Sequence, residues 1–354
     1  MHWVVVDRPG DGRSYYPMSL HTSRAEVLLL VGRWDEVENV FRGNLEMAEA
    51  SGDKRLTAEC RNKMGTILHR RGAFDGALEH YRQALAEFSD LGREDGQAAA
   101  LECLGMLHVF QGRFQSAGEF YFRALELVER MGHQPSIANI HLNIGNLFIQ
   151  QGMLAEARGH FQKKLEMSRA LGDRLGEGMA LGSLGIAASM EGDHTTALDY
   201  MRRQIEISSQ LGDKLGKAYG IGNVGLVYGD IGEAGQALDC FLRQMQICRE
   251  MGDRKGLLQA LEALGPALNE QGRHQEALGH LEEAADLARG MNVPPLLASV
   301  LWALAQARRG TGDFSGAGVA AREAMKMAGK TGNRELAEKC GKFLEEPESN
   351  VREG

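Results

Sequence analysis

The stretch LGDRLGEGMALGSLG, residues 171–185, contains two glycines whose positions return along the whole chain. Gly172 stands directly before Asp173, and a glycine or asparagine returns at this place every 40 residues. The series consists of Gly52, Gly92, Gly132, Gly172, Gly212, Gly252, Asn292 and Gly332. Glycine and asparagine most readily adopt the left-handed conformation just past a helix end. Each position of this series is therefore predicted to end a helix.

Three further series keep the same period of 40. The second series is Gly32, Gly72, Gly112, Gly152, Gly192, Gly232, Gly272 and Gly312. The third is Ala25, Gly65, Gly105, Gly145, Gly185, Gly225, Gly265 and Ala305. The fourth is Val37, Ala77, Ala117, Ala157, Ala197, Ala237, Ala277 and Ala317. The second series also ends helices, whereas the third and fourth lie inside helices.

Each 40-residue unit is therefore predicted to form two antiparallel helices, named here helix A and helix B. Helix A runs from a first-series position to the next second-series glycine, and helix B runs on to the next first-series position. Small third-series residues let the two helices approach closely. Four residues after the recurring alanine stand large apolar residues that fit against them, at Tyr81, Tyr121, Phe161, Met201 and Phe241. Asp53, Asp173, Asp213 and Asp253 are expected to cap the helices that follow them.

Composition and charge narrow the class of protein. The chain has 354 residues, of which 43% are hydrophobic and 25% charged, and its formal net charge is −8. This charge argues against a nucleic-acid partner, and no apolar run is long enough to cross a membrane. The N-terminus lacks the features of a signal peptide. The five scattered cysteines are expected to be reduced thiols. We expect a cytoplasmic protein without membrane insertion.

One motif suggests a cofactor, because Gly220, Gly222 and Gly225 match G-x-G-x-x-G. A dinucleotide-binding turn must follow a strand and open a helix. Gly225 instead belongs to the third series, in the middle of a predicted helix, so no cofactor is expected. The extra glycines, Gly220 and Gly222, have two interpretations: a bare backbone patch on a groove wall, or packing within the repeat.

No catalytic or metal-binding arrangement emerges from the sequence. His80, His160 and His280 recur at one repeat position, but they stand on separate repeats and cannot share a zinc ion. Metal-binding histidine spacings are absent from the sequence, as are nucleophile motifs. We therefore predict no metal site and no enzymatic activity.

The periodic pattern resembles the tetratricopeptide repeat. The small residue on helix A, the glycine between helices, the alanine on helix B and the following aromatic residue all match at the family's offsets. Residues 171–185 and 193–216 look most like the repeats of the Pins/LGN cell-polarity adaptors, and bacterial signalling proteins contain similar arrays. The Pins/LGN proteins end in Gα-binding GoLoco motifs, which we do not expect in this sequence up to Gly354.

The resemblance implies an all-α fold: a right-handed superhelical solenoid of about eight helix-turn-helix repeats plus a C-terminal capping helix. We expect an N-terminal tail at 1–17, the eight-repeat array at 18–332, and the capping helix with a short tail at 333–354. The tail at 1–17 has two interpretations, a disordered segment or a strand that packs on helix A of the first repeat.

The resemblance also implies a binding site, because helix A lines the concave wall in such arrays. Counting from the third-series residue of each repeat gives the expected groove positions. The predicted peptide-binding residues are Asn62, His69, Arg70, Met106, Phe110, Asn143, Asn146, Gln150, Ser183, Ile186, Asn223, Leu226, Asp230, Asn269, Trp302 and Arg309. Side-chain amides in this set carry both donors and acceptors, so they can bond a peptide main chain whatever its sequence.

Two functions are consistent with this site. The first is an adaptor or scaffold that binds an extended or partly helical segment of a partner protein in the groove. The alternative is a regulatory sensor, whose superhelix changes shape when a short signalling peptide binds. The sequence leaves self-association open and does not identify the partner.

Overall fold

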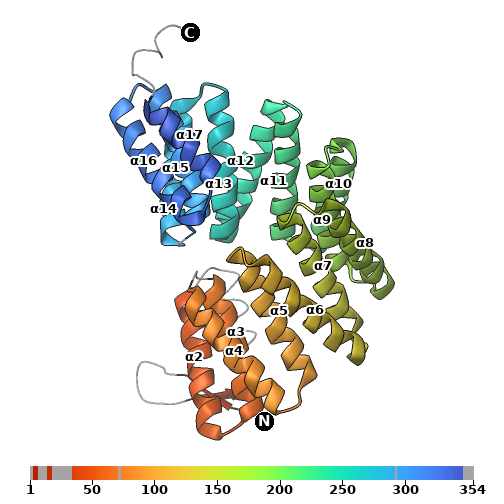
Figure 1. Cartoon of the computed structure of the whole chain (residues 1–354). Helices are drawn as coiled ribbons and strands as arrows, with labels where there is room; N and C mark the ends of the chain where they lie inside the picture. Colours follow the sequence, from red (N-terminus) through yellow and green to blue (C-terminus); the bar gives the residue numbers. More distant parts are fainter. Residues whose placement is uncertain (1–2, 7–13, 18–33, 71–72, 292, 346–354) are drawn as a thin grey trace. The chain divides into compact units, whose positions relative to one another are not determined.

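The computed structural model describes residues 3–6, 14–17, 34–70, 73–291 and 293–345. The chain divides into two compact units, residues 1–211 (unit 1) and residues 212–354 (unit 2). The helices of unit 1 are α2 (Trp34–Ser51), α3 (Lys54–Arg70), α4 (Phe74–Asp90), α5 (Glu94–Phe110), α6 (Phe114–Met131), α7 (Gln134–Gln150), α8 (Leu154–Leu171), α9 (Arg174–Met190) and α10 (His194–Leu211). Figure 1 shows them following one another as hairpins, in which α3, α5, α7 and α9 are the A helices.

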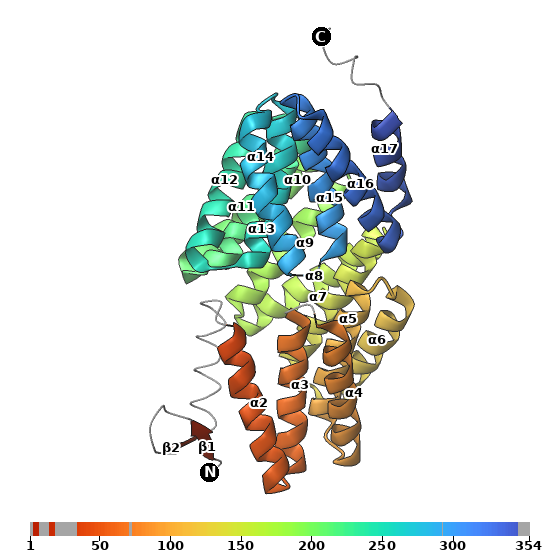
Figure 2. The same cartoon turned by 90° about the vertical axis from the view of Figure 1, so that its left-hand side faces the viewer.

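Unit 2 continues the same hairpins. Its helices are α11 (Lys214–Asp230), α12 (Ala234–Met251), α13 (Arg254–Glu270), α14 (His274–Gly290), α15 (Pro294–Gly310), α16 (Phe314–Thr331) and α17 (Arg334–Glu345). The last helix, α17, packs beside α16 and buries Cys340 and Phe343 (Figure 2). The helical-repeat prediction and the predicted C-terminal helix are thus confirmed. Within the described ranges, no helix is both long and apolar enough to cross a membrane.

The N-terminal segment forms a short strand pair. Strand β1 (Trp3–Val6) pairs antiparallel with β2 (Ser14–Pro17), with Val4 opposite Tyr16. The strand interpretation of this segment is therefore the one that the structure supports. The predicted helix A of the first repeat lies in residues 18–33, outside the described residues, and so does its predicted contact with the strand.

The glycines predicted to end helices do so. Gly172 follows α8 with a φ of 68°, a left-handed conformation that other residues adopt only with strain. Every described glycine of the first and second series has a positive φ. Gly32, Gly72 and Asn292 lie outside the described residues.

The predicted aspartate caps form with one exception. The carboxylates of Asp53, Asp173 and Asp213 each accept a hydrogen bond from the main-chain N–H three residues later, at 2.9–3.0 Å. Asp253 makes no such bond, because its Oδ2 accepts the hydroxyl of Tyr219 at 2.9 Å instead. A contact between two helices of unit 2 therefore replaces a local cap.

Within each hairpin from repeat two to repeat seven, a large side chain of helix B lies on a bare glycine of helix A. A Cβ atom placed on Gly65 would lie 2.6 Å from the ring of Tyr81, and one on Gly105 would lie 2.5 Å from Tyr121. The same contact joins Gly145 to Phe161, Gly185 to Met201, Gly225 to Phe241 and Gly265 to Leu281. These glycines are thus required by packing, as the third series predicts.

Two histidines meet inside the fourth repeat. His141 of α7 is buried, and its Nδ1 lies 3.0 Å from Nδ1 of His160 on α8. One ring donates this hydrogen bond and the other accepts it, so the accepting Nδ1 carries no proton. Burial, followed by the proximity of His141, lowers the pKa of His160 to about 4. The sequence suggested a structural role for His160 but did not reveal its partner. In the described part of the chain, no group of three or more His, Cys, Asp or Glu residues could hold a metal ion.

A matched pair of substitutions tests the glycine contact. Gly185→Leu should lower the stability by ~1–3 kcal/mol, because its Cβ would already lie 2.8 Å from Met201 Cγ. Gly159→Leu on α8 should instead raise the stability by up to ~1 kcal/mol, since nothing lies within 4 Å of its Cβ position. Thermal melts followed by circular dichroism measure both. Equal shifts in the two variants would contradict the packing assignment.

The histidine pair should make stability depend on pH. A histidine in the unfolded chain titrates near ~6.5, whereas His160 in the fold titrates at about 4. Between these values the unfolded chain binds more protons, so stability should fall as the pH is lowered through this window. In His160→Phe, which copies Phe120 at the same position of the preceding repeat, the drop in Tm from about pH 7.5 to about pH 5 should be smaller. An unchanged drop would show that His160 does not titrate as described.

Candidate functional site

The A helices of unit 1 share an outward surface. Helix α5 contacts α7, and α7 contacts α9, so their outward positions form one surface. We call this surface the helix A face. It carries Met106, Phe110, Asn139, Asn143, Asn146, Gln150, Leu175, Met179, Ser183, Ile186 and Met190. Seven of these residues belong to the predicted peptide-binding set. The other four, which do not, are Asn139, Leu175, Met179 and Met190.

An apolar stripe runs along α9. Leu175, Met179, Ile186 and Met190 are spaced by about one helical turn or two, and their exposed fractions are 50%, 47%, 36% and 52%. Ser183 lies half-buried between them. Large apolar side chains in a row on a surface are typical of an interaction site. The sequence identified Ser183 and Ile186, and counting in both directions from Ile186, one helical turn at a time, would have found the rest.

A row of amides runs along the neighbouring helix α7. Asn139, Asn143, Asn146 and Gln150 follow one another at helical spacing, and all except the half-buried Asn143 are exposed. The sequence of α7 contains no Asp, Glu, Lys or Arg. The middle of the helix A face is therefore polar without being charged.

Two of these amides bond charged side chains from other helices, the half-buried Glu102 and the buried Lys164. Nδ2 of Asn143 donates to Oε1 of Glu102 on α5 at 2.7 Å. Burial raises the pKa of the Glu102 carboxyl, and the bond from Asn143 opposes this. Oδ1 of Asn139 accepts from Nζ of Lys164 on α8 at 2.8 Å. Lys164 is only 1% exposed, and its ammonium lies 3.7 Å from Oδ2 of Asp173.

The predicted residues nearer the N-terminus lie in a less open environment. His69 packs edge-on against Phe110, with ring centroids 6.0 Å apart, and both contact Phe74. Met106 packs partly against the core. Oδ1 of Asn62 is buried and has no hydrogen-bond partner among the described residues. The side chain of Arg70 lies outside the described part of the structure.

In unit 2, three predicted residues hold helices together. Nδ2 of Asn269 on α13 donates to the carbonyl of Ala303 on α15 at 2.9 Å. The ring of Trp302 packs edge-on against Phe343 of α17 at 5.1 Å, and Arg309 donates to the Phe343 carbonyl. These three side chains are therefore engaged in contacts between helices.

The other three predicted residues of unit 2 are more open. Asn223 is half-buried, Leu226 is 53% exposed, and Asp230 is exposed. All three lie on α11, with Asn223 one turn before Leu226. They resemble the helix A face of unit 1 on a smaller scale.

The extra glycines of α11 face the interior. Gly220 and Gly222 are both buried, and a Cβ atom on Gly222 would collide with the amide of Gln244 on α12. The packing interpretation is thus confirmed for Gly222, and the interpretation of a bare patch on a groove wall is wrong there.

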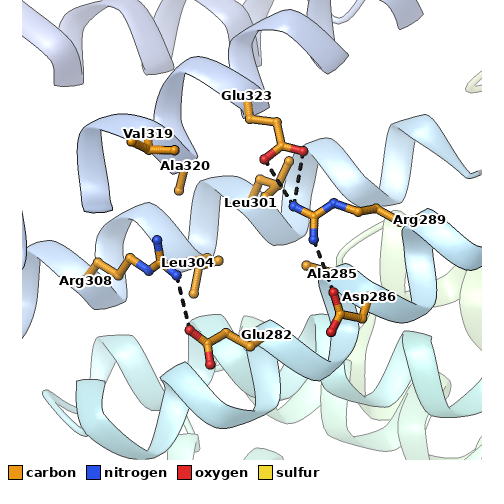
Figure 3. A pocket seen from close by; sticks show the side chains of 10 residues that line it. All are labelled: Glu282, Ala285, Asp286, Arg289, Leu301, Leu304, Arg308, Val319, Ala320 and Glu323. Carbon is orange, nitrogen blue, oxygen red and sulfur yellow. Dashed lines mark hydrogen bonds and ion pairs between the residues drawn. The ribbon is translucent and has the colours of Figure 1, made fainter. Parts of the chain in front are cut away.

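A separate hollow lies between α14, α15 and α16 of unit 2, with a volume of ≈ 370 Å³ (Figure 3). Its arginines are already paired. Arg289 bonds Glu323 at 3.1 Å and Asp286 at 3.2 Å, and Arg308 bonds Glu282 at 3.2 Å. With its positive charges neutralised in this way, the hollow offers less to a ligand than the helix A face.

Comparisons with solved structures show the same fold at low sequence identity. A Rap protein complexed with Competence and Sporulation Factor is 13% identical, with a TM-score of 0.62, and the match covers 92% of this chain and 96% of that one. The apo form of RapI is 14% identical, with a TM-score of 0.57 and coverages of 80% and 99%. A signal transduction ATPase with a tetratricopeptide repeat sensor, from Pyrococcus horikoshii, is 13% identical, with a TM-score of 0.56 and coverages of 87% and 52%.

Sequence comparison gives the family. No curated protein sequence matches the chain. The family model described as Tetratricopeptide repeat matches residues 16–86, 96–170, 136–210 and 215–290, which is well over half of the chain. The 40-residue hairpins and their glycine contacts agree with this match, and the chain belongs to the tetratricopeptide repeat family.

Proposed function

We propose that this protein is an adaptor that binds an extended or partly helical segment of a partner protein on the helix A face of unit 1. The observation that carries the proposal is the exposed apolar stripe of α9 beside the uncharged amide row of α7. Membership in the tetratricopeptide repeat family agrees with a protein-binding role.

The two rows supply different parts of the binding free energy. Covering a half-exposed side chain such as Met179 or Met190 contributes about 1 kcal/mol. The amides of Asn146 and Gln150 are exposed and can replace the water lost by a partner's main chain. An apolar stripe beside neutral polar groups therefore suits a polypeptide better than a charged ligand.

The proposed site is narrower than the predicted set. It retains Met106, Phe110, Asn143, Asn146, Gln150, Ser183 and Ile186, and adds Asn139, Leu175, Met179 and Met190. Asn223, Leu226 and Asp230 are proposed as a second contact region on unit 2. Asn269, Trp302 and Arg309 are left out because they bond neighbouring helices.

The proposal also includes the predicted organisation of the chain. The eight-repeat array spans 18–332, preceded by a tail at 1–17 and followed by the capping helix and short tail at 333–354. All five cysteines are free thiols, which fits a reducing compartment such as the cytoplasm. The likeness to the Pins/LGN adaptors stays a prediction.

A peptide sensor is the second candidate function. The Rap structure that shares this fold over nearly its whole length is a complex with Competence and Sporulation Factor. A sensor would bind a free short peptide and become more compact. Small-angle scattering with and without the peptide separates the two functions, since an adaptor should bind long segments without compaction.

The adaptor function can be tested with peptides selected from a displayed random library against the full chain. Met179→Gln combined with Met190→Gln should weaken their binding by about tenfold or more, because two apolar contacts are lost. Fluorescence anisotropy measures the affinity, and melting curves check the fold. Phe122→Gln is the matched control, since Phe122 is equally exposed but lies on α6.

Undiminished binding to the double methionine variant would remove the helix A face from the proposal. Equal losses in the double variant and in Phe122→Gln would indicate nonspecific hydrophobic binding.

A further inference from the structure

We infer that Lys164 and Glu102 are positioning residues that fix the amides of Asn139 and Asn143 in opposite orientations, so that the helix A face offers one donor and one acceptor to a partner's main chain. The inference rests on the proposed function. It concerns which main-chain groups of the bound segment are recognised, and in what order.

Lys164 determines the orientation of Asn139. An ammonium group can only donate, so the amide atom 2.8 Å from Nζ must be the oxygen, Oδ1. The NH₂ group of Asn139, an exposed residue, is thereby left to donate to a partner. Lys164 is buried, so its charge acts on Asn139 without facing the partner directly.

Glu102 determines the opposite orientation at Asn143. An ionised carboxylate can only accept, so the amide atom 2.7 Å from Oε1 must be the nitrogen, Nδ2. The oxygen of Asn143 is then the atom left to accept from a partner. A donor and an acceptor thus stand four residues apart on α7, separated by about 6 Å along the helix axis.

This pair matches the edge of an extended polypeptide. Such an edge offers carbonyl oxygens and N–H groups in a fixed order, so a carbonyl can meet Asn139 while an N–H meets Asn143. Amides able to turn over would accept either order. With both orientations fixed, a segment in the wrong register would place donor against donor.

Packing alone does not require these two charged residues. The position of Lys164 is filled by Ala84, Ala124, Gln204, Gln244, Ala284 and Ala324 in other repeats. The position of Glu102 is filled by Asn62, Leu142, Gly182, Gly222, Glu262 and Trp302. Burying a charge costs stability unless it is well paired, so a role beyond packing explains their presence.

The test uses one peptide selected against the full chain, with its main-chain N–H groups methylated one at a time. At one position, methylation should weaken binding to the wild type by about five- to tenfold, the effect of a lost hydrogen bond. In Glu102→Gln the loss should shrink to about twofold, because glutamine can both donate and accept and lets Asn143 turn over. Glu262→Gln is the control: Glu262 is a half-buried glutamate at the same position of repeat seven, and this variant should keep the full loss.

The donor side is tested by replacing one peptide amide at a time with an ester, which weakens its carbonyl as an acceptor. An ester at the position that faces Asn139 should weaken binding to the wild type, and should weaken binding to Lys164→Gln much less. Lys164→Gln introduces the residue that repeats five and six carry at this position. Lys163→Gln, the same change at an exposed neighbour, is the control. If Lys164→Gln does not fold, Lys164→Ala copies repeats two and three.

The outcomes separate this inference from the proposed function. Methylation and ester losses that are unchanged in Glu102→Gln and Lys164→Gln would overturn the inference while leaving the helix A face as the binding site. Selected peptides that bind the double methionine variant as tightly as the wild type would overturn both this inference and the proposed function. A further NMR measurement uses the protein without any peptide. In the wild type, the side-chain amide signal of Asn143 should shift as the pH passes through the titration of Glu102. In Glu102→Gln the same signal should not shift.

Discussion

The contact between a bare glycine on helix A and a large side chain on helix B governs the structure. Phe161 lies on Gly145 and Met201 lies on Gly185, and the same contact recurs in each described hairpin from repeat two to repeat seven. It fixes the rotation of helix A about its own axis, because one side must face helix B. The opposite side of helix A is then exposed on the surface. The amide row of α7 and the apolar stripe of α9 are consequences of where their glycines stand.

A second packing rule explains the polar residues of helix B. Gln204 and Gln244 lie directly against Gly182 and Gly222, which make room for them. Where helix B has alanine instead, as at Ala124 and Ala324, helix A carries the larger Glu102 and Trp302. Volume is thus conserved across the pair. Lys164 departs from this rule, because the paired position on helix A holds Leu142 rather than glycine, and its side chain bonds Asn139 instead.

The helix ends and the hairpin packing could be predicted because each depends on one residue type repeated at a fixed spacing. The site could be predicted only in part. Counting positions along helix A identified Asn143 and Ile186, but it could not show that α17 covers Trp302 or that Asn269 bonds Ala303. These contacts come from helices that the count did not include. Lys164 was missed for the same reason, since it belongs to helix B and yet acts on the helix A face.

The distribution of charge has a consequence for recognition. Lys164 is buried and Glu102 is half-buried, and both bond amides of α7, which itself has no Asp, Glu, Lys or Arg. Under the proposed function, a partner that binds here would exchange water for neutral hydrogen bonds and apolar contacts, so its affinity would depend little on salt. Selectivity then comes from the order of main-chain groups and the fit of apolar side chains on α9. Under the proposed function, such a surface would tolerate varied polar sequences in a partner and would favour segments whose main chain lies extended beside α7.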